Sequence, residues 1–195
     1  MDRWLDRWLP LIAERNQGRG EGDDAAEILE LGCGGGLDTE ALISAGNAVV
    51  AIDRSADAIA KARLLAPTAR FFCQDIRDNF PAAHSNVIVA SLSLHYFSWT
   101  DTLALVSRIH ATLPVGGLLF CRLNSVNDIH YGATGHALIE KNYFLVNGEP
   151  KRFFDESDVN RMFSAGWRRL HIEETIVHRY QHPKSAWEVV MERFA

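Results

Sequence analysis

Long apolar runs and excess positive charge are both missing from this sequence. No uninterrupted hydrophobic stretch reaches membrane-spanning length, so we expect no transmembrane helix. With 20 Lys and Arg against 25 Asp and Glu, the net charge of −5 opposes the attraction that nucleic acids and anionic membranes exploit. We therefore expect neither kind of partner. The acidic, Trp-bearing start is not typical of a signal peptide, which predicts a cytoplasmic protein.

Cysteine is scarce, and metal-ligand spacing is missing. The three cysteines, Cys33, Cys73 and Cys121, match no metal site, and no carboxylate–histidine cluster has ligand spacing. We expect buried free thiols that stay reduced, and no metal. A chain of 195 residues with 47% hydrophobic content can bury one substantial core, which predicts a single domain over residues 1–195.

A glycine cluster after an apolar run is the most informative feature that the sequence does contain. Residues 28–31 are apolar except for Glu30 and predict a buried strand, and a helix is expected from Leu37. Between them, Gly32, Gly34 and Gly36 allow positive φ and close approach of a ligand to the backbone. Because the first amides of a helix have no partner within it, this turn is predicted to bind part of a nucleotide.

The spacing of this turn separates several classes of nucleotide-binding protein. No Gly-Lys-Ser/Thr follows, so nothing would hold a triphosphate and its magnesium, and a P-loop is excluded. The dinucleotide pattern Gly-x-Gly-x-x-Gly/Ala needs a small residue where this chain has Leu37. A nicotinamide-dinucleotide oxidoreductase remains an alternative, because such an enzyme would also use an acid at the end of the second strand.

Two further predicted strands carry acids near their ends. Residues 48–53 form an apolar run that ends on Asp53, and residues 69–76 include Asp75. A strand–helix–strand unit brings the ends of adjacent parallel strands together, so Asp53 should reach both ribose hydroxyls of a nucleoside above the glycine turn. A fourth strand is expected over 86–91.

In this order the motifs resemble those of class I S-adenosylmethionine-dependent methyltransferases, whose first motif is Gly-x-Gly-x-Gly with an acid two places earlier, as Glu30 is. The resemblance implies S-adenosylmethionine as cofactor. It implies that Asp75 accepts from the adenine amino group while the Ile76 backbone meets the ring. Glu30 would orient the turn or meet the amino acid moiety. The full cofactor set predicted is Glu30, Gly32, Cys33, Gly34, Gly36, Asp53, Arg54, Asp75, Ile76, Ser91 and Leu92.

The resemblance also implies the fold, an α/β, Rossmann-like, doubly wound sheet of seven mostly parallel strands that ends in an antiparallel hairpin. The hairpin is predicted from residues 168–180 and 185–194, which flank the turn signal His182-Pro183-Lys184. Residues 1–17 are predicted to hold an amphipathic N-terminal helix, which either packs on the sheet or acts as a lid. Residues 124–154 are predicted to be an insertion that covers the substrate.

The predicted function is methyl transfer to a small-molecule acceptor by in-line displacement, with positioning as the main catalytic device. His95 is the first candidate for a general base, and His130 or His136 is the next. Residues 91–94 lack the Asn/Asp-Pro-Pro-Tyr/Phe signature of nucleic-acid amino methylation. Residues 122–155 look most like small bacterial methyltransferases of the tellurite-resistance-like group. A catalytically silent S-adenosylmethionine-binding regulatory protein is the main alternative.

Overall fold

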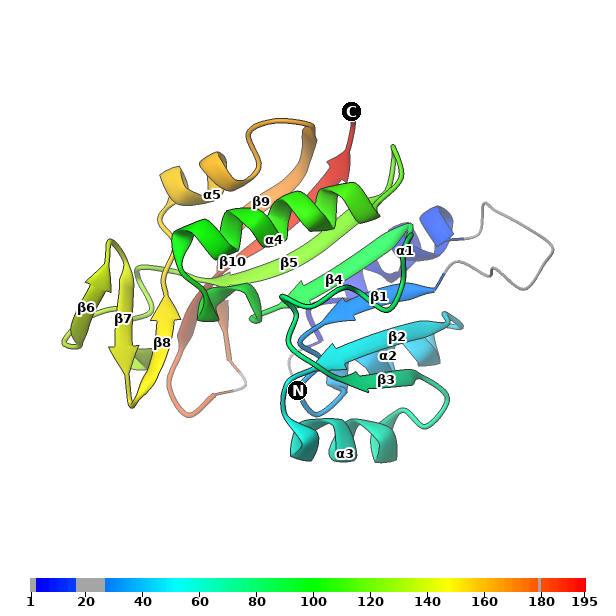
Figure 1. The fold of residues 1–195 in the computed structure, drawn as a ribbon, viewed down its shortest axis with the longest axis horizontal. Coiled ribbons are helices and arrows are strands. Elements are labelled where there is room, and N and C mark those ends of the chain that lie inside the picture. The colour runs from blue at the N-terminus through cyan, green and yellow to red at the C-terminus, as the bar shows by residue number, and fades with distance from the viewer. Residues whose placement is uncertain (1–2, 17–26, 179) are drawn as a thin grey trace.

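A seven-stranded sheet forms the centre of the molecule. The computed structural model describes residues 3–16, 27–178 and 180–195. The strand order is β3-β2-β1-β4-β5-β10-β9 (Figure 1). In chain order these strands are β1 (Ile28–Leu31), β2 (Val49–Asp53), β3 (Arg70–Cys73), β4 (Val87–Ser91), β5 (Leu118–Asn124), β9 (Trp167–Val177) and β10 (Lys184–Arg193).

The direction of the strands confirms the predicted fold class. The neighbours from β3 to β5 pair in parallel, so their carboxyl ends lie along one edge. The last strand, β10, pairs antiparallel with both β5 and β9. The predicted hairpin is therefore present, and its second strand lies between β5 and the first.

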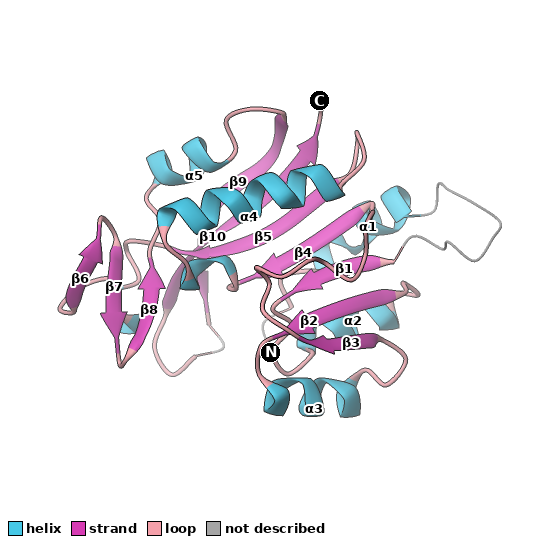
Figure 2. Cartoon of the chain, viewed as in Figure 1, coloured by secondary structure: helices cyan, strands magenta, loops and turns pink. Residues whose placement is uncertain are grey.

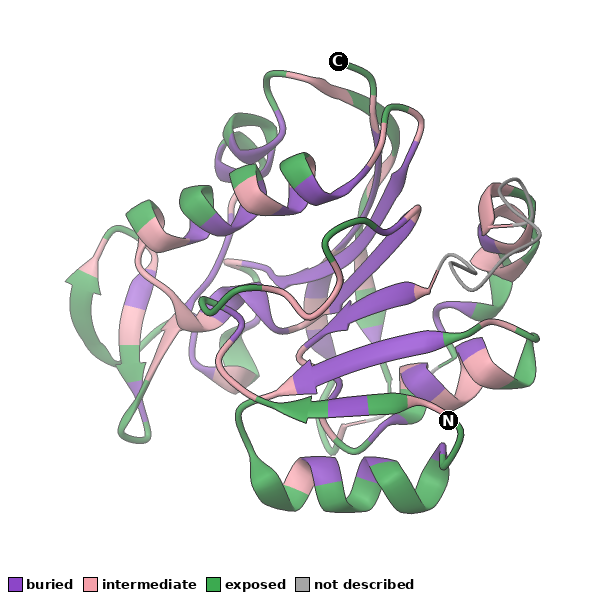
Figure 3. Ribbon diagram, turned by 45° about the vertical axis from the view of Figure 1, so that its right-hand side comes forward, coloured by how far each residue is buried: buried purple, intermediate pink, exposed green. Residues whose placement is uncertain are grey.

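Helices cover both faces of the sheet, because alternate strand residues point in opposite directions. Leu29 and Leu31 pack on the side of α4 (Trp99–Thr112) and α5 (Glu156–Met162). Ile28 packs on the side of α1 (Leu9–Asn16), α2 (Leu37–Ser44) and α3 (Ala56–Leu65). Figure 2 shows these layers, and Figure 3 shows that the central strands are buried over most of their length. Burial of each large aliphatic side chain contributes about 1.5–3 kcal/mol.

The segment predicted as a covering insertion contains a small sheet of its own. Strands β6 (Ala137–Glu140), β7 (Tyr143–Val146) and β8 (Glu149–Arg152) form an antiparallel sheet beside the main one, preceded by the short 3-10 helix η3 (Ile129–Tyr131) (Figure 1). Asn147 and Gly148, which join β7 to β8, have φ of 52° and 84°. Asn-Gly is a strong hairpin signal, so the sequence held this information.

The N-terminal segment packs against the fold. A 3-10 turn, η1 (Asp6–Trp8), precedes α1, whereas one helix was expected. Residues 1, 2 and 17 of the predicted segment lie outside the described residues. Trp4 and Leu5 are buried in the core, and the Trp8 indole donates to Glu188 Oε1 at 2.6 Å. Among the described residues, no helix has the length and apolar character needed to cross a membrane.

The prediction that all three cysteines are buried was wrong for one of them. Cys33 and Cys121 are buried, but Cys73 is exposed, and all three are free thiols. Cys73 is the last residue of β3, which is an edge strand of the sheet, and Phe71 is the one buried residue of that strand.

Candidate functional site

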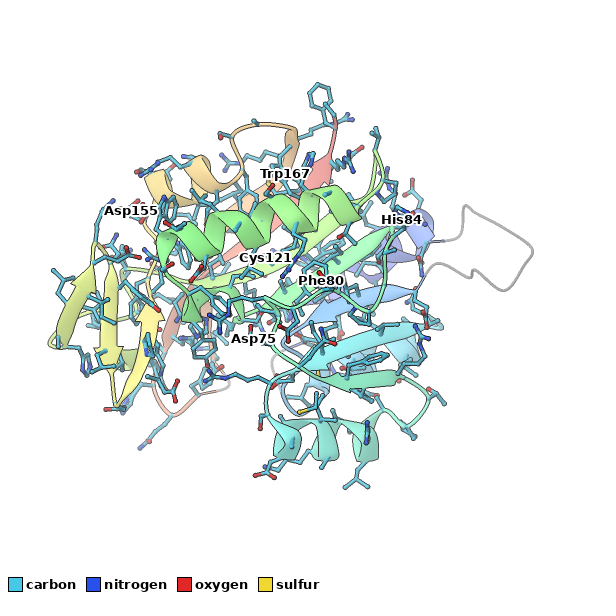
Figure 4. All side chains as sticks on the ribbon, viewed as in Figure 1. Asp75, Phe80, His84, Cys121, Asp155 and Trp167 are labelled. Atoms are coloured by element: carbon cyan, nitrogen blue, oxygen red, sulfur yellow. The ribbon has the colours of Figure 1, made fainter. Side chains whose placement is uncertain are left out.

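A pocket of about 710 Å³ opens at the carboxyl edge of the parallel strands, where open α/β sheets bind ligands. Figure 4 labels Asp75 at this edge. We call one part the glycine end, which is lined by Gly32, Cys33, Gly34, Gly35, Leu37, Asp38, Asp53, Arg54, Ser55, Ala58, Asp75 and Ile76. We call the other part the lysine end, which is lined by His95, Tyr96, Phe97, Asn124, Tyr131, Lys151, Tyr180 and Lys184. Residues 91–93 lie between them in the chain and also line the pocket.

The three glycines of the turn have different roles. A Cβ on Gly32 would lie 2.4 Å from Cβ of Ser93, and one on Gly36 would lie 2.9 Å from Cα of Ala62 in α3. Packing within the fold therefore requires both. A Cβ on Gly34 would meet no atom within 4 Å, although its φ of 53° still favours glycine. Gly34 is thus the glycine of the three that leaves open space for a ligand.

Asp53 connects the end of β2 to this turn. Its Oδ2 accepts from the main-chain N–H of Gly34 at 2.8 Å, and its Oδ1 accepts from that of Ser55 at 2.9 Å. Each carboxylate oxygen can accept a second hydrogen bond. Because Asp53 also lines the pocket, this remaining capacity is available to a pair of hydroxyls.

Glu30 lies behind the turn and is not among the described lining residues. It is buried, and its Oε2 accepts from the Thr39 hydroxyl of α2 at 2.5 Å. Burial, and next the negative charge of Asp38, raise the pKa of Glu30 to about 8. This placement fits the orienting role of Glu30. Burial, and next the charge of Glu30, also raise the pKa of the neighbouring Cys33 thiol, which does line the pocket.

Asp75 and Ile76 both line the pocket, in the loop just after β3. Asp75 is held by Arg77, whose Nε donates to Oδ1 at 3.0 Å and whose Nη2 donates to Oδ2 at 2.7 Å. These bonds are the main reason that the pKa of Asp75 is lowered. The Ile76 carbonyl accepts from Arg108, and its side chain is buried in the core.

The segment after β4 enters the pocket in a strained conformation. Leu92 has φ of 53°, which is uncommon for a residue with a side chain and occurs mainly at functional sites. Its N–H donates to the Arg122 carbonyl at 2.9 Å, and Ser91 Oγ accepts from Arg122 Nε at 2.9 Å. Buried Arg122 of β5 therefore fixes both predicted residues from behind.

Arg54 lies at the rim and links the two ends of the pocket. Its Nη2 donates to Glu149 of β8 at 3.0 Å, and its guanidinium lies 5.4 Å from the centre of the Tyr96 ring. Arg54 is exposed, so we expect this ion pair to contribute little to stability. It does place the small sheet next to the glycine end.

His95 is the one candidate base that the structure places among the described lining residues. It is 5% exposed, and its Nδ1 is buried without a partner among the described residues. Burial, then the charges of Lys184 and Lys151, hold its pKa well below the usual range, so the imidazole is neutral. The ring centres of His130 and His182 lie 5.1 Å apart in a stacked arrangement. Neither His130 nor exposed His136 is among the described lining residues.

The lysine end contains residues that sequence reasoning missed. Lys151 comes from β8, Tyr180 comes from the turn between β9 and β10, and Lys184 is the first residue of β10. Lys184 Nζ donates to Asp128 Oδ2 at 2.6 Å in a buried pair. The Tyr131 hydroxyl lies 3.1 Å from both N and O of His182. No local motif marks these residues, since long-range packing brings them together.

The N-terminal segment lies one layer behind the pocket. The Trp4 indole donates to both Asp38 oxygens, at 3.1 and 3.0 Å, and the Arg122 guanidinium lies 4.7 Å from the centre of its ring. Asp38 lines the pocket, whereas none of the described lining residues belongs to 3–16. Trp4 therefore supports the wall without facing the pocket.

The pocket suits a polar ligand with positive charge at the glycine end. Ser93 Oγ, His95 Nδ1 and Asn124 Oδ1 are buried with no partner among the described residues. Each such atom costs about 1–3 kcal/mol unless a ligand or water bonds it. Asp38, Asp53 and Asp75 give the glycine end a negative charge.

Within the described ranges, no group of three or more His, Cys, Asp and Glu residues could hold a metal ion.

Comparison with known proteins finds a family match for part of the chain. Residues 28–117, from β1 to the residue before β5, match the model of the family described as a methyltransferase domain. The match covers fewer than half of the 195 residues, so it shows that this region is similar to a methyltransferase domain.

Individual proteins that the chain resembles are also named as methyltransferases. A trans-aconitate 2-methyltransferase from Delftia acidovorans is 37% identical over 100 residues, which make up 49% of this chain and 37% of that protein. The chain thus spans well under two thirds of the length of the curated relatives it matches. A Methanosarcina mazei methyltransferase structure has a TM-score of 0.74 at 18% identity, covering 95% of this chain and 97% of that one.

A third relative was solved with ligands bound. It is the 1,6-didemethyltoxoflavin-N1-methyltransferase of Burkholderia thailandensis, with bound 1,6-didemethyltoxoflavin and S-adenosylhomocysteine. Its TM-score is 0.68 at 18% identity, and the match covers 100% of this chain and 82% of that one. At 18% identity, this likeness shows that the two proteins share a fold, and nothing beyond the fold is inferred from it.

Proposed function

We propose that this protein transfers a methyl group from S-adenosylmethionine to a small-molecule acceptor in the pocket described above. The observation that carries the proposal is the hydrogen bond between Asp53 and the Gly34 amide. It joins the end of β2 to Gly34, the position in the glycine turn with open space beside it. The carboxylate oxygens of Asp53, which can accept hydrogen bonds from hydroxyls, therefore lie next to main chain that a ligand can approach.

The residues present fit the cofactor. Asp53 would accept from the ribose hydroxyls, the turn from Gly32 to Gly36 would lie under the remainder of the nucleoside, and Asp75 would meet the adenine amino group. Glu30 would hold α2 in place through Thr39. Cys33, Arg54, Ile76, Ser91 and Leu92 complete the proposed cofactor set.

Catalysis would consist mainly of positioning. When bound, S-adenosylmethionine supplies a methyl group that its sulfonium has already activated. The protein then has to align the acceptor with the carbon–sulfur bond and exclude water, which can supply several kcal/mol. Buried, neutral His95 would orient the acceptor, and His95 is also the first candidate base for an acceptor that must lose a proton.

We further propose that residues 1–195 act as one domain, with the insertion 124–154 as the substrate cover. Tyr143 of β7 donates to the Tyr96 carbonyl at 3.0 Å, which supports this role. For residues 1–17 the contacts of Trp4 favour packing over a moving lid. A cytoplasmic location and a kinship with tellurite-resistance-like enzymes remain predictions from the sequence.

Two alternatives make different predictions. A silent regulatory protein would bind S-adenosylmethionine and transfer no methyl group. An oxidoreductase would bind a nicotinamide dinucleotide, for which Leu37, at the pocket wall and 43% exposed, replaces the small residue of that pattern.

Calorimetric titration with S-adenosylhomocysteine and with NAD separates these classes. We expect S-adenosylhomocysteine to bind and NAD to bind far more weakly. Transfer of labelled methyl to carboxylates, thiols, phenols, amines and metalloid oxyanions then tests catalysis. Trans-aconitate is included because curated relatives carry that name. No S-adenosylhomocysteine binding by the folded protein would refute the proposal, and binding without transfer to any acceptor would favour the silent protein.

A further inference from the structure

The two ends of the pocket carry opposite charge. Asp38 and Asp53 line the glycine end, whereas the described lining of the lysine end contains two lysines and no Asp or Glu. The charge at the lysine end cannot serve a cationic cofactor, because a positive ligand would be repelled there. The two lysines therefore bear on the second ligand of the pocket, which is the methyl acceptor.

Of the two lysines, Lys151 carries the uncompensated charge. Lys184 is buried and pairs with buried Asp128 at 2.6 Å. Lys151 is partly buried on β8 and forms no ion pair within the described part of the chain. Its neighbour Glu149 is engaged by Arg54 across the rim. A partly desolvated ammonium without a carboxylate partner favours an anionic ligand.

The remaining groups define the shape and polarity of that ligand. The rings of Tyr131 and Tyr180 lie 5.2 and 5.8 Å from Lys184 Nζ. His95 Nδ1 and Asn124 Oδ1 are buried polar atoms without described partners. A small organic molecule that combines an apolar skeleton with a charged polar group matches these surroundings.

We propose that the acceptor is a small organic carboxylate, recognised through its charge by Lys151 and Lys184 and methylated on a carboxylate oxygen. The proposal rests on the methyltransferase function proposed above. One carboxylate oxygen can remain with the lysines while a lone pair of the other forms the new O–CH3 bond. The electron pair of the broken S–CH3 bond stays on sulfur, and anion plus sulfonium give a neutral ester and a thioether. No proton moves, so the neutral His95 orients the acceptor without acting as a base.

The test measures binding to the protein saturated with S-adenosylhomocysteine, using calorimetry. The probes are two carboxylates, benzoate and succinate, each against its neutral amide, benzamide and succinamide. The variants are Lys151→Met, which keeps the length of the side chain, and Lys151→Arg, which keeps the charge. Lys61→Met makes the same change on exposed α3, outside the described lining.

We expect at least one carboxylate to bind on the order of tenfold more tightly than its amide, as for a charge-assisted hydrogen bond. Lys151→Met should abolish this preference, while Lys151→Arg and Lys61→Met should retain it. Equal affinity for acid and amide, absence of carboxylate binding, or a preference that survives in Lys151→Met would overturn the inference. Affinity for S-adenosylhomocysteine is measured for the wild type and for each variant. If the folded wild type does not bind S-adenosylhomocysteine, the proposed function itself is refuted.

Discussion

The glycine end and the lysine end of the pocket are built in different ways. All lining residues of the glycine end lie between positions 32 and 76, and they follow three neighbouring parallel strands in turn. The lysine end takes its residues from η2 (Leu94–Tyr96) and the residue after it, β5, η3, β8, the β9–β10 turn and the start of β10. Main-chain hydrogen bonds support the first end, whereas side-chain contacts between distant segments support the second. The two ends should therefore respond to different mutations.

The largest effect is expected from Lys184→Met, which should lower the free energy of unfolding by about 3–5 kcal/mol. The substitution leaves Asp128, which is 1% exposed, buried without its cation. Urea unfolding measures the loss, and the double variant Lys184→Met/Asp128→Asn should recover part of it. The control Lys141→Met removes a largely exposed cation from its pairs with Asp155 and Asp158 and should cost less than about 1 kcal/mol. Similar losses in both single variants would show that the buried pair has no special role.

The next largest effect concerns the glycine end. Asp53→Ala should weaken S-adenosylhomocysteine binding by about 1.5–3 kcal/mol, on the order of tenfold to a hundredfold, because charge-assisted bonds to the ribose are lost. Calorimetry measures the affinity, and Asp57→Ala, an exposed change on α3, is the matched control. Unchanged affinity in a folded Asp53→Ala protein would remove Asp53 from the cofactor site.

The same difference in construction explains what could be predicted from the sequence. The glycine end is encoded by local patterns, an apolar strand followed by glycines or an acid, and each pattern predicts its own element. The cap of α5 is also local, since Asp155 and Asp158 exchange hydrogen bonds with each other's main-chain N–H. The predicted strands that end in the glycine turn and in the two acids, and the helix from Leu37, agree with the structure.

The lysine end could not be predicted in this way. Lys151 lies in a four-residue strand and Lys184 begins β10, and neither position has a local signature. Both line the pocket, and Lys184 does so beside the β9–β10 turn, which packs on η3 through Tyr131 and His182, residues that are 51 positions apart. His95 was found because it lies in the segment after β4, whereas Lys184 and Lys151, which add to the effect of burial on its pKa, were not.

A third, smaller effect tests whether Glu30 acts behind the turn. Because the pKa of Glu30 is raised to about 8, the folded protein keeps a proton that the unfolded chain releases above about pH 4.3. The contribution of Glu30 to the free energy of unfolding is therefore largest at low pH and is lost as the pH rises towards 8. Glu30→Gln should remove at least about 1 kcal/mol of that loss. Urea unfolding at pH 5 and 8.5 measures it, with exposed Glu156→Gln as control. The same pH dependence in wild type and Glu30→Gln would contradict the assignment.

The smallest effect separates direct from indirect use of Asp75. Asp75→Ala should lower affinity for S-adenosylhomocysteine a few-fold to about tenfold, since one hydrogen bond from the adenine amino group is lost. Its ion pair with Arg77, whose side chain is 56% exposed, contributes less than about 1 kcal/mol, so the melting temperature without ligand should change little.

Arg77→Met and an inosine analogue of the cofactor product separate the two roles of Asp75. If Asp75 contacts adenine, Arg77→Met keeps most of the affinity, because the carboxylate stays in place. The wild type should then prefer S-adenosylhomocysteine to S-inosylhomocysteine, whose ring carries oxygen in place of the amino group, and Asp75→Ala should lose that preference. Equal weakening in Asp75→Ala and Arg77→Met, with the preference for adenine intact in both, would mean that Asp75 only positions Arg77. The glycine end would then read the adenine ring through groups other than this carboxylate.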